Sequence, residues 1–125
     1  MIKITEFKDP LLLALTIAQD EKKVKLLWMM ESRKLELKQF RQNLEWHSDL
    51  LIEELRQLTE LGLVSRVIHL KEKPVRVEYA LSNRGALFLK CLRNMKKAGT
   101  QLMVDYGLKQ QLIDAGYLQE MQKAQ

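Results

Sequence analysis

The sequence predicts a mainly helical α+β fold in which a short two-stranded β-ribbon lies between helices. Three observations predict this fold. A leucine-rich helical pattern occupies residues 48–61 and stops at Gly62. Two short strand-like segments follow around a polar turn at residues 71–74, and a further helical pattern begins after Ser82. Helix, ribbon and helix in this order form the second half of a winged helix-turn-helix.

The first helix is expected within residues 9–20. Asp9 supplies an N-cap, and Pro10 suits the first helical position. The next eight residues read LLLALTIA and are apolar on nearly every face. Such a helix needs cover on more than one side, so we expect a second subunit over it. Complete enclosure within the same chain is the alternative.

Two short helices are expected next, at residues 21–30 and 35–43. Their apolar residues recur at helical spacing, and a tryptophan follows in the turn before the next helix. The residues expected to point inward are Val24, Leu26, Leu27, Trp28, Met30, Leu37, Phe40, Leu44 and Trp46. All three of Trp28, Trp46 and Tyr79 are interpreted as core residues in preference to the lining of an effector pocket.

The helix at residues 48–61 has two distinct faces. Ser48 is expected to cap it, and Asp49 suits the positive end of its dipole. Gly62 is the expected stop signal. The inward residues are Leu51, Leu55 and Leu58, and the outward residues are Asp49, Ile52, Glu53, Arg56, Gln57 and Glu60.

The ribbon is expected within residues 63–82. From Val75 to Leu81, apolar and polar residues alternate, which is typical of a half-buried strand. Ser82 is expected to cap a helix that runs to about Ala98, and Gly99-Thr100 to break it. We expect a single domain at residues 1–125. It comprises a dimerisation helix at 9–20, a winged-helix core at 21–98 and a second dimerisation helix at 99–125, with interface residues Leu11, Leu12, Leu15, Leu112, Ile113, Tyr117 and Leu118.

The composition is that of a folded protein, with 46% hydrophobic and 30% charged residues. No apolar run is long enough for a membrane span and no signal peptide is evident, so cytoplasmic residence is expected. Cys91 is the only cysteine and is interpreted as a buried structural thiol in preference to a sensor. His47 and His69 lack companions at metal-ligand spacing. We expect no metal, no cofactor and no enzymatic activity, because no catalytic motif is present.

The net charge of +5 mildly favours a polyanionic partner. Its distribution is more informative. Residues 62–97 hold nine basic and two acidic residues, a net +7. Residues 47–61 hold four acids and one base, a net −3. The helix at residues 48–61 is therefore net acidic, whereas the ribbon and the helix after it are together net basic.

The stretches GLVSRV and PVRVEYALSNRG resemble the wing of HxlR-type regulators, a branch of the MarR-like winged-helix proteins. This resemblance runs from Leu55 to about Leu92. Weaker similarity covers DPLLLALTIAQDEKKVKLLWMM and residues 37–41. It implies a dimeric transcriptional regulator that binds operator DNA, with terminal helices forming the dimer interface. Many members carry a redox-sensing cysteine where this chain has Asp9, so that sensing chemistry is excluded at this position.

The resulting hypothesis is a homodimer bound to double-stranded DNA, with helix 48–61 in the major groove and the ribbon on the backbone or in the minor groove. Arg56 would contact guanine or phosphate, Glu53 and Asp49 cytosine, and Ile52 a thymine methyl. The candidate DNA-binding residues are Lys38, Arg41, Ser48, Asp49, Ile52, Glu53, Arg56, Lys71, Lys73 and Arg76. The alternative is a winged helix that binds proteins, since an acidic recognition helix would suit such a module. A small-molecule effector stays an open question.

Overall fold

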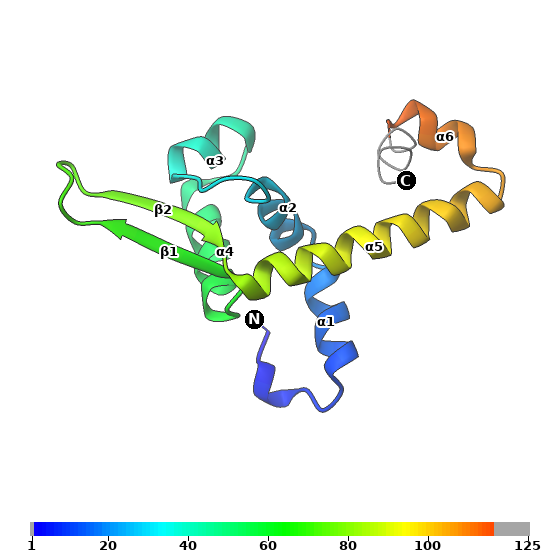
Figure 1. The fold of residues 1–125 in the computed structure, drawn as a ribbon, viewed down its shortest axis with the longest axis horizontal. Helices are drawn as coiled ribbons and strands as arrows, with labels where there is room; N and C mark the ends of the chain where they lie inside the picture. Colours follow the sequence, from blue (N-terminus) through cyan, green and yellow to red (C-terminus); the bar gives the residue numbers. More distant parts are fainter. Residues whose placement is uncertain (1, 117–125) are drawn as a thin grey trace. The chain divides into compact units, whose positions relative to one another are not determined.

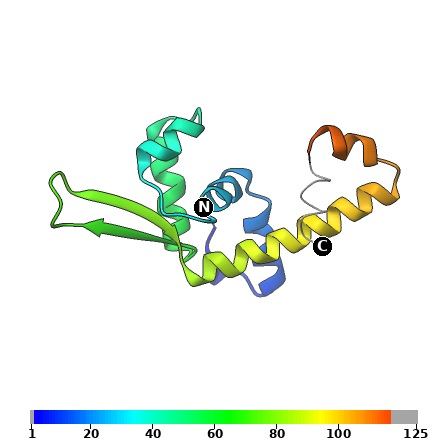
Figure 2. The ribbon, with the colours of Figure 1, turned by 45° about the horizontal axis from the view of Figure 1, so that its top comes forward.

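The computed structural model describes residues 2–116 and has the predicted winged-helix architecture (Figures 1 and 2). The chain forms two compact units, one ending at Leu89 and one starting at Lys90, and each is described by itself. In chain order the elements are η1 (Ile4–Glu6), α1 (Pro10–Ala18), α2 (Glu21–Met29), α3 (Leu37–Asn43), α4 (Ser48–Glu60), β1 (Val64–His69), β2 (Arg76–Leu81), α5 (Asn83–Asp105) and α6 (Lys109–Asp114).

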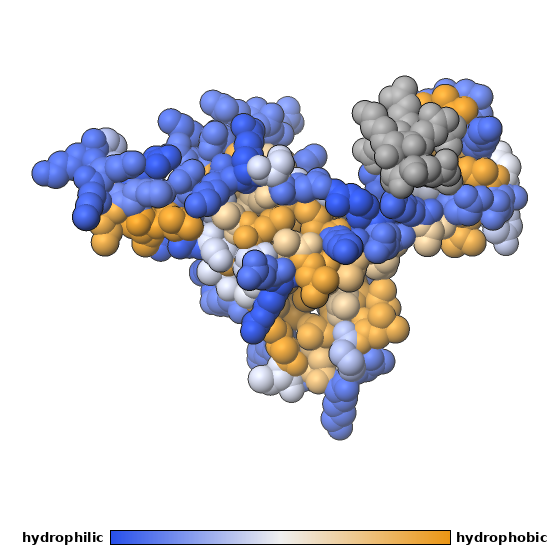
Figure 3. Space-filling view, viewed as in Figure 1, coloured by the Kyte–Doolittle hydropathy of each residue, from blue (hydrophilic) through white to orange (hydrophobic). Residues whose placement is uncertain are grey.

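Helix α1 begins as predicted. The side chain of Asp9 accepts a hydrogen bond from the backbone N–H of Leu11 at 2.9 Å, and Pro10 occupies the first turn. Three leucines of this helix are exposed, Leu11 at 65%, Leu12 at 55% and Leu15 at 42%. The surface over α1 is correspondingly apolar (Figure 3). The described residues of the chain therefore leave this helix largely uncovered.

Helix α2 buries only part of the predicted face. Leu26, Leu27 and Met30 are buried as expected, but Val24 and Trp28 are only half-buried. The buried side of α2 also includes Lys23, because this lysine is neutralised by Asp20, the N-cap of α2, and by Glu54 on α4. A pattern of apolar residues alone does not reveal such a position.

The core of the first unit lies between α2, α3, α4 and the base of the ribbon. Phe40, Leu51, Leu55 and Leu58 are fully buried. Leu35 does not start α3 as expected. It forms a β-bridge with Tyr79, with backbone N–O distances of 2.9 and 2.8 Å, so α3 begins at Leu37.

Three further residues were predicted to lie in the core, and one of them does. Tyr79 is a core residue as predicted, and its ring packs edge-on against Phe40 with centroids 6.4 Å apart. Trp46 is only half-buried and Leu37 likewise, so neither anchors the core. The turn before α4 instead buries Leu44.

Helix α4 presents the predicted two faces, but its start differs by one residue. His47 is the N-cap and makes no side-chain capping bond, while Ser48 is already helical. The predicted cap at Ser48 is therefore wrong. Gly62 ends the helix with a φ of 78°, a conformation that favours glycine.

The ribbon is an antiparallel pair whose register runs from Val64 opposite Leu81 to His69 opposite Arg76. Ser82 joins it to α5. Its hydroxyl donates to the carbonyl of Gly62 at 2.6 Å and accepts from the N–H of Gly85 at 3.0 Å, which confirms the predicted cap. A Cβ at Gly85 would lie 1.9 Å from the carbonyl oxygen of Leu63, so this packing requires glycine.

Helix α5 does not break at Gly99-Thr100, contrary to the prediction. It continues to Asp105, and the hydroxyl of Thr100 donates to the carbonyl of Lys96 at 2.7 Å. Gly107 then ends this region with a φ of 80°. The predicted interface residues Tyr117 and Leu118 lie outside the described residues. Within residues 2–116, no helix combines the length and the apolar character needed to cross a bilayer.

Candidate nucleic-acid interface

The outward face of α4 is the first part of the candidate interface. Its side chains point away from the buried leucines, and Ile52 is 46% exposed. Asp49, Glu53, Arg56 and Glu60 are also exposed. This exposure leaves the face available to a partner and confirms the prediction for these residues. Gln57, also expected on the outward face, is instead half-buried and accepts a hydrogen bond from the buried Lys23.

Arg56 is held by two glutamates on the same face. Its Nε donates to Oε2 of Glu53 at 2.8 Å, and its Nη2 donates to Oε1 of Glu53 at 2.5 Å. Its Nη1 donates to Glu60. The hydrogen bond from Arg56 lowers the pKa of Glu53 to about 2, and the same pairing raises the pKa of Arg56. Glu53 thus binds Arg56 through both of its carboxylate oxygens.

A buried lysine lies behind this face, and the sequence pattern did not single it out. Lys23 is 3% exposed, and its Nζ lies 2.9 Å from Asp20, 2.9 Å from Glu54 and 2.7 Å from Gln57. Burial opposes the charge of Lys23, but its bonds to Glu54 and Asp20 outweigh burial and raise its pKa. Burial likewise acts to raise the pKa of Asp20, and the bonds from Lys23 lower it overall. This cluster joins α2 to α4.

The only sequence signal for this cluster is the spacing of acids. Asp20 precedes Lys23 by three residues, which is compatible with an ion pair on one helix face. The contact with Glu54 and Gln57 spans two helices, so it depends on how α2 packs against α4. Local sequence does not determine that packing.

The ribbon carries a network of paired charges. Nε of Arg76 donates to Glu72 at 2.7 Å, and its Nη1 lies 3.5 Å from Glu78. Nε2 of His69 lies 2.7 Å from Glu78. Arg76 is thus already neutralised by acids of the ribbon, while the ion pairs of the described residues include neither Lys71 nor Lys73.

The ribbon also has an apolar side. Ile68 is 44% exposed, Leu70 76% and Val75 53%. Figure 3 shows this apolar strip along one side of the ribbon. In Figures 1 and 2 the ribbon projects away from α2, α3 and α4, so its tip with Lys71 and Lys73 forms a surface separate from α4.

Helix α3 and the start of α4 supply the remaining candidates. Lys38 and Arg41 are exposed, and Lys38 lies 3.6 Å from Glu36. Ser48 is half-buried at the start of α4. The structure brings the α4 candidates onto one face, and it places the ribbon candidates on a projecting arm.

The predicted dimerisation residues have different surroundings. Leu11, Leu12 and Leu15 are exposed on α1. In α6, Ile113 is 44% exposed but Leu112 is only 3% exposed, so Leu112 is packed within the chain.

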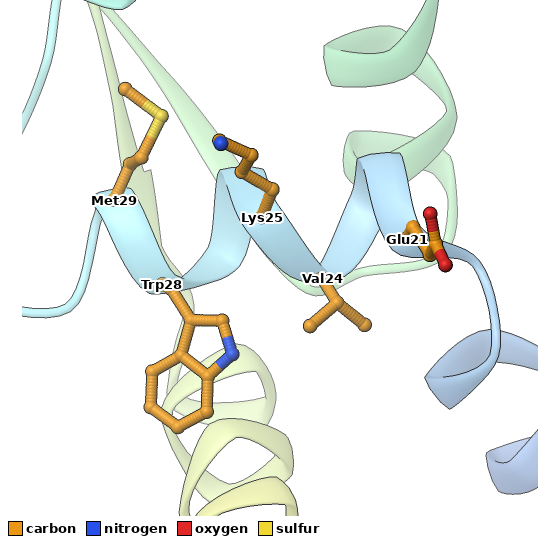
Figure 4. Close-up of a pocket in the computed structure, with 5 residues that line it drawn as sticks. All are labelled: Glu21, Val24, Lys25, Trp28 and Met29. Carbon is orange, nitrogen blue, oxygen red and sulfur yellow. The ribbon is translucent and has the colours of Figure 1, made fainter. Parts of the chain in front are cut away.

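Two other features bear on effector binding and sensing. Cys91 is exposed, so its interpretation as a buried thiol is wrong. Trp28 and Val24 point to the same side of α2 and line an open pocket of about 470 Å³ (Figure 4). All of its lining residues belong to α2: Glu21, Val24, Lys25, Trp28 and Met29. A pocket formed by one helix encloses little, and we assign it no ligand.

Comparison with known proteins places this fold. A family model described as HxlR-like helix-turn-helix matches residues 19–106. A MarR-family transcriptional regulator from Enterococcus faecalis V583 has a similar structure, with a TM-score of 0.74 and 23% identity, covering 86% of this chain and 98% of that chain. Curated proteins include no match to the chain.

Two further solved structures are similar. The redox regulator HypR in its reduced form shares 26% identity, with a TM-score of 0.66 over 74% of this chain and 92% of that chain. The reduced transcriptional regulator YodB from B. subtilis shares 19% identity, with a TM-score of 0.65 over 79% of this chain and 93% of that chain. The family match covers most of the chain and agrees with the helix–ribbon–helix order, and the chain therefore belongs to the HxlR-like helix-turn-helix family.

Proposed function

We propose that this chain is a transcriptional regulator that binds double-stranded DNA as a homodimer. The observation that carries the proposal is the division of α4 into a buried leucine face and an exposed polar face, in a chain that belongs to the HxlR-like family. A helix exposed in this way and flanked by a cationic ribbon has the form of a recognition helix. The two solved structures described as transcriptional regulators support the same assignment.

In this proposal α4 enters the major groove and Arg56 contacts a base. Three of the five N–H donors of Arg56 are bonded to Glu53 and Glu60, so two donors are left. Two donors are what a bidentate contact with O6 and N7 of guanine requires. Ile52 would contact a thymine methyl, and Asp49 would accept from N4 of cytosine.

The flanking cations would bind the phosphate backbone. Lys38, Arg41 and Ser48 would contact phosphates beside the major groove. Lys71 and Lys73 at the ribbon tip would neutralise phosphates or enter the minor groove. Arg76 would first have to leave Glu72, so its contribution is expected to be smaller.

The acids of α4 oppose this binding. Glu53 and Glu60 are partly neutralised by Arg56, but Asp49 adds a further negative charge at the start of the helix. Phosphates repel such a surface unless nearby cations outweigh it. We therefore expect modest affinity and a steep dependence on salt concentration.

A second candidate function is that of a protein-interaction module. The acidic face of α4 and the exposed apolar side of the ribbon favour it, because both surfaces suit a basic or apolar protein partner. The two functions differ in their response to polyanions. Only the first predicts retention on duplex DNA.

The test is a fluorescence titration of labelled random duplex DNA at 50 and 200 mM salt. A DNA-binding protein with about four phosphate contacts should lose roughly 100-fold in affinity between these concentrations. Selection from a random duplex pool would then define a preferred site. Absence of binding at both salt concentrations would refute the proposal and leave the protein-interaction function.

A further inference from the structure

We propose that Lys23 is a positioning residue, which orients Arg56 through Gln57 and Glu53 and thereby determines selectivity for one base pair. The consequence for selectivity rests on the proposed DNA binding. The series of hydrogen bonds from Lys23 to Arg56 is present in the free protein. These two parts are therefore tested separately.

The ammonium of Lys23 is fully occupied. It has three N–H donors, and three acceptors lie within 2.7–2.9 Å of Nζ: Asp20, Glu54 and Gln57. Although Lys23 also borders a cavity of about 280 Å³ beneath the amino-terminal segment, it has no donor left for an anion there. Its charge acts on the protein's own groups.

This arrangement fixes the orientation of the Gln57 amide. The carbonyl oxygen of Gln57 faces the ammonium of Lys23 at 2.7 Å. The opposite orientation would place an N–H group against the ammonium, where two donors would face one another. The amide nitrogen of Gln57 must therefore point away from Lys23, and it donates to Oε1 of Glu53 at 3.1 Å.

Glu53 transmits this orientation to Arg56. Its Oε1 accepts from both Gln57 and Nη2 of Arg56, and its Oε2 accepts from Nε of Arg56. The carboxylate is thus bound on both sides. The guanidinium of Arg56 meets it edge-on and keeps two N–H groups for another partner.

The series of hydrogen bonds starts from a buried group, and this burial allows it to restrict the side chains that follow. An ion pair between exposed side chains is usually worth little, because both side chains retain many rotamers. Here the side chain of Lys23 is only 4% exposed, and Glu54 is 12% exposed. A series of hydrogen bonds that starts from such a fixed group restricts Gln57, then Glu53, then Arg56.

The test replaces Gln57 with methionine. This substitution interrupts the series of hydrogen bonds between Lys23 and Glu53 and leaves Lys23 paired with Asp20 and Glu54. Gln111→Met, at an exposed position on α6, is the matched control. A second pair of variants is Lys23→Met and its control Lys22→Met. The control removes the same charge from the exposed neighbouring lysine. Thermal unfolding of each variant establishes that it is folded.

The first readout needs no DNA. In the wild type, the NMR signal of the Arg56 Nε–H group should report the bond to Glu53. In Gln57→Met this signal should move toward that of an unrestricted arginine, and in Gln111→Met it should not. An unchanged Arg56 signal in either folded Gln57→Met or folded Lys23→Met would overturn the proposal.

The second readout is base selectivity on the preferred duplex. Gln57→Met should reduce discrimination at the base pair that Arg56 contacts by about five- to tenfold, with unchanged binding to random DNA. In an Arg56→Ala background, Gln57→Met should have no additional effect. A full effect in that background would contradict the proposal. A wild type that binds no DNA would refute the proposed function. The NMR readout would still show whether the series of hydrogen bonds orients Arg56 in the free protein.

Discussion

Arg56 is held by two glutamates in the structure and is the residue that we propose contacts a base. It is the one basic residue among four acids in residues 47–61, and both of its glutamate partners lie on α4 itself. An arginine buttressed in this way is restricted before it meets a base. Preorganisation reduces the entropy lost on binding, so it offsets part of the affinity that the neighbouring acids remove.

The pH dependence of the Glu53–Arg56 pair tests this arrangement. The pKa of Glu53 is lowered to about 2 from 4.5, mainly by its hydrogen bond with Arg56. A lowered pKa means that the pair contributes fully above pH 4.5 and is lost as pH falls toward 2. Titration of the Glu53 carboxyl by NMR should show a midpoint near 2, and Arg56→Ala should return it toward 4.5. A wild-type midpoint near 4.5 would exclude the pair in solution.

Replacement of Arg56 tests its role in base recognition. If Arg56 contacts guanine, Arg56→Ala should weaken binding to the preferred site by about 1–3 kcal/mol and relax selectivity at one position. Measurement on the preferred duplex and on a random duplex separates the two contributions. Equal loss on both would mean that Arg56 contacts phosphate alone.

The burial of a residue could be predicted where it follows from the spacing of apolar residues, but not where it depends on a partner from another helix. The buried Leu51, Leu55 and Leu58 follow from their spacing alone, and all three are buried. Lys23 was overlooked because a lysine on a short amphipathic helix is normally exposed. Its burial depends on Glu54, whose position relative to α2 is set by tertiary packing.

At the scale of elements, the ribbon was predicted closely and the end of α5 was not. Strict alternation from Val75 to Leu81 specifies one strand, and a short polar turn specifies its partner. Gly99 was interpreted as a helix end, but one glycine costs only about 1 kcal/mol in a helix. In a helix of 23 residues this cost is distributed over many hydrogen bonds, and the helix continues.

Two glycines of α5 should respond oppositely to replacement by alanine. Gly99 is helical, and beyond the adjacent turns of its own helix no atom of residues 2–116 lies within 4 Å of the point that an alanine Cβ would occupy. Gly99→Ala should therefore stabilise the protein by up to about 1 kcal/mol. At Gly85 the same Cβ would lie 1.9 Å from a carbonyl oxygen of Leu63, so Gly85→Ala should destabilise it strongly. Urea unfolding of both variants measures the difference. Destabilisation by Gly99→Ala would show that this position is not helical in solution.

The ribbon tip should provide the salt-dependent part of DNA binding. Lys71→Ala with Lys73→Ala should weaken binding to all sequences alike and flatten the salt slope by about two units, because two phosphate contacts are lost. Arg76→Ala is the comparison, and its effect should be smaller because Arg76 is paired with Glu72. Affinities measured across a series of salt concentrations give the slopes. An unchanged slope in the double variant would remove the ribbon tip from the interface.

At the scale of the whole molecule, a single copy of the chain leaves apolar surface exposed. Leu11, Leu12 and Leu15 extend from α1 as one apolar surface, which a stable monomer rarely leaves open. Two copies joined there would place two recognition helices in one particle. Such a dimer would recognise a two-fold symmetric site with half-sites about one helical turn apart.

Glutamate at Leu12 and Leu15 tests this assembly. Both side chains are exposed in one copy of the chain, so Leu12→Glu with Leu15→Glu should leave the fold intact while two buried charges per subunit oppose association. Sedimentation at micromolar concentration should show a dimer for the wild type and a monomer for the variant, with similar circular dichroism. Lys8→Glu, at an exposed position before the start of α1, changes the net charge by the same two units and is the control for added charge. Since a monomer holds one recognition helix, the variant should also lose its preference for paired half-sites over a single half-site. A wild type that sediments as a monomer would exclude the two-half-site arrangement.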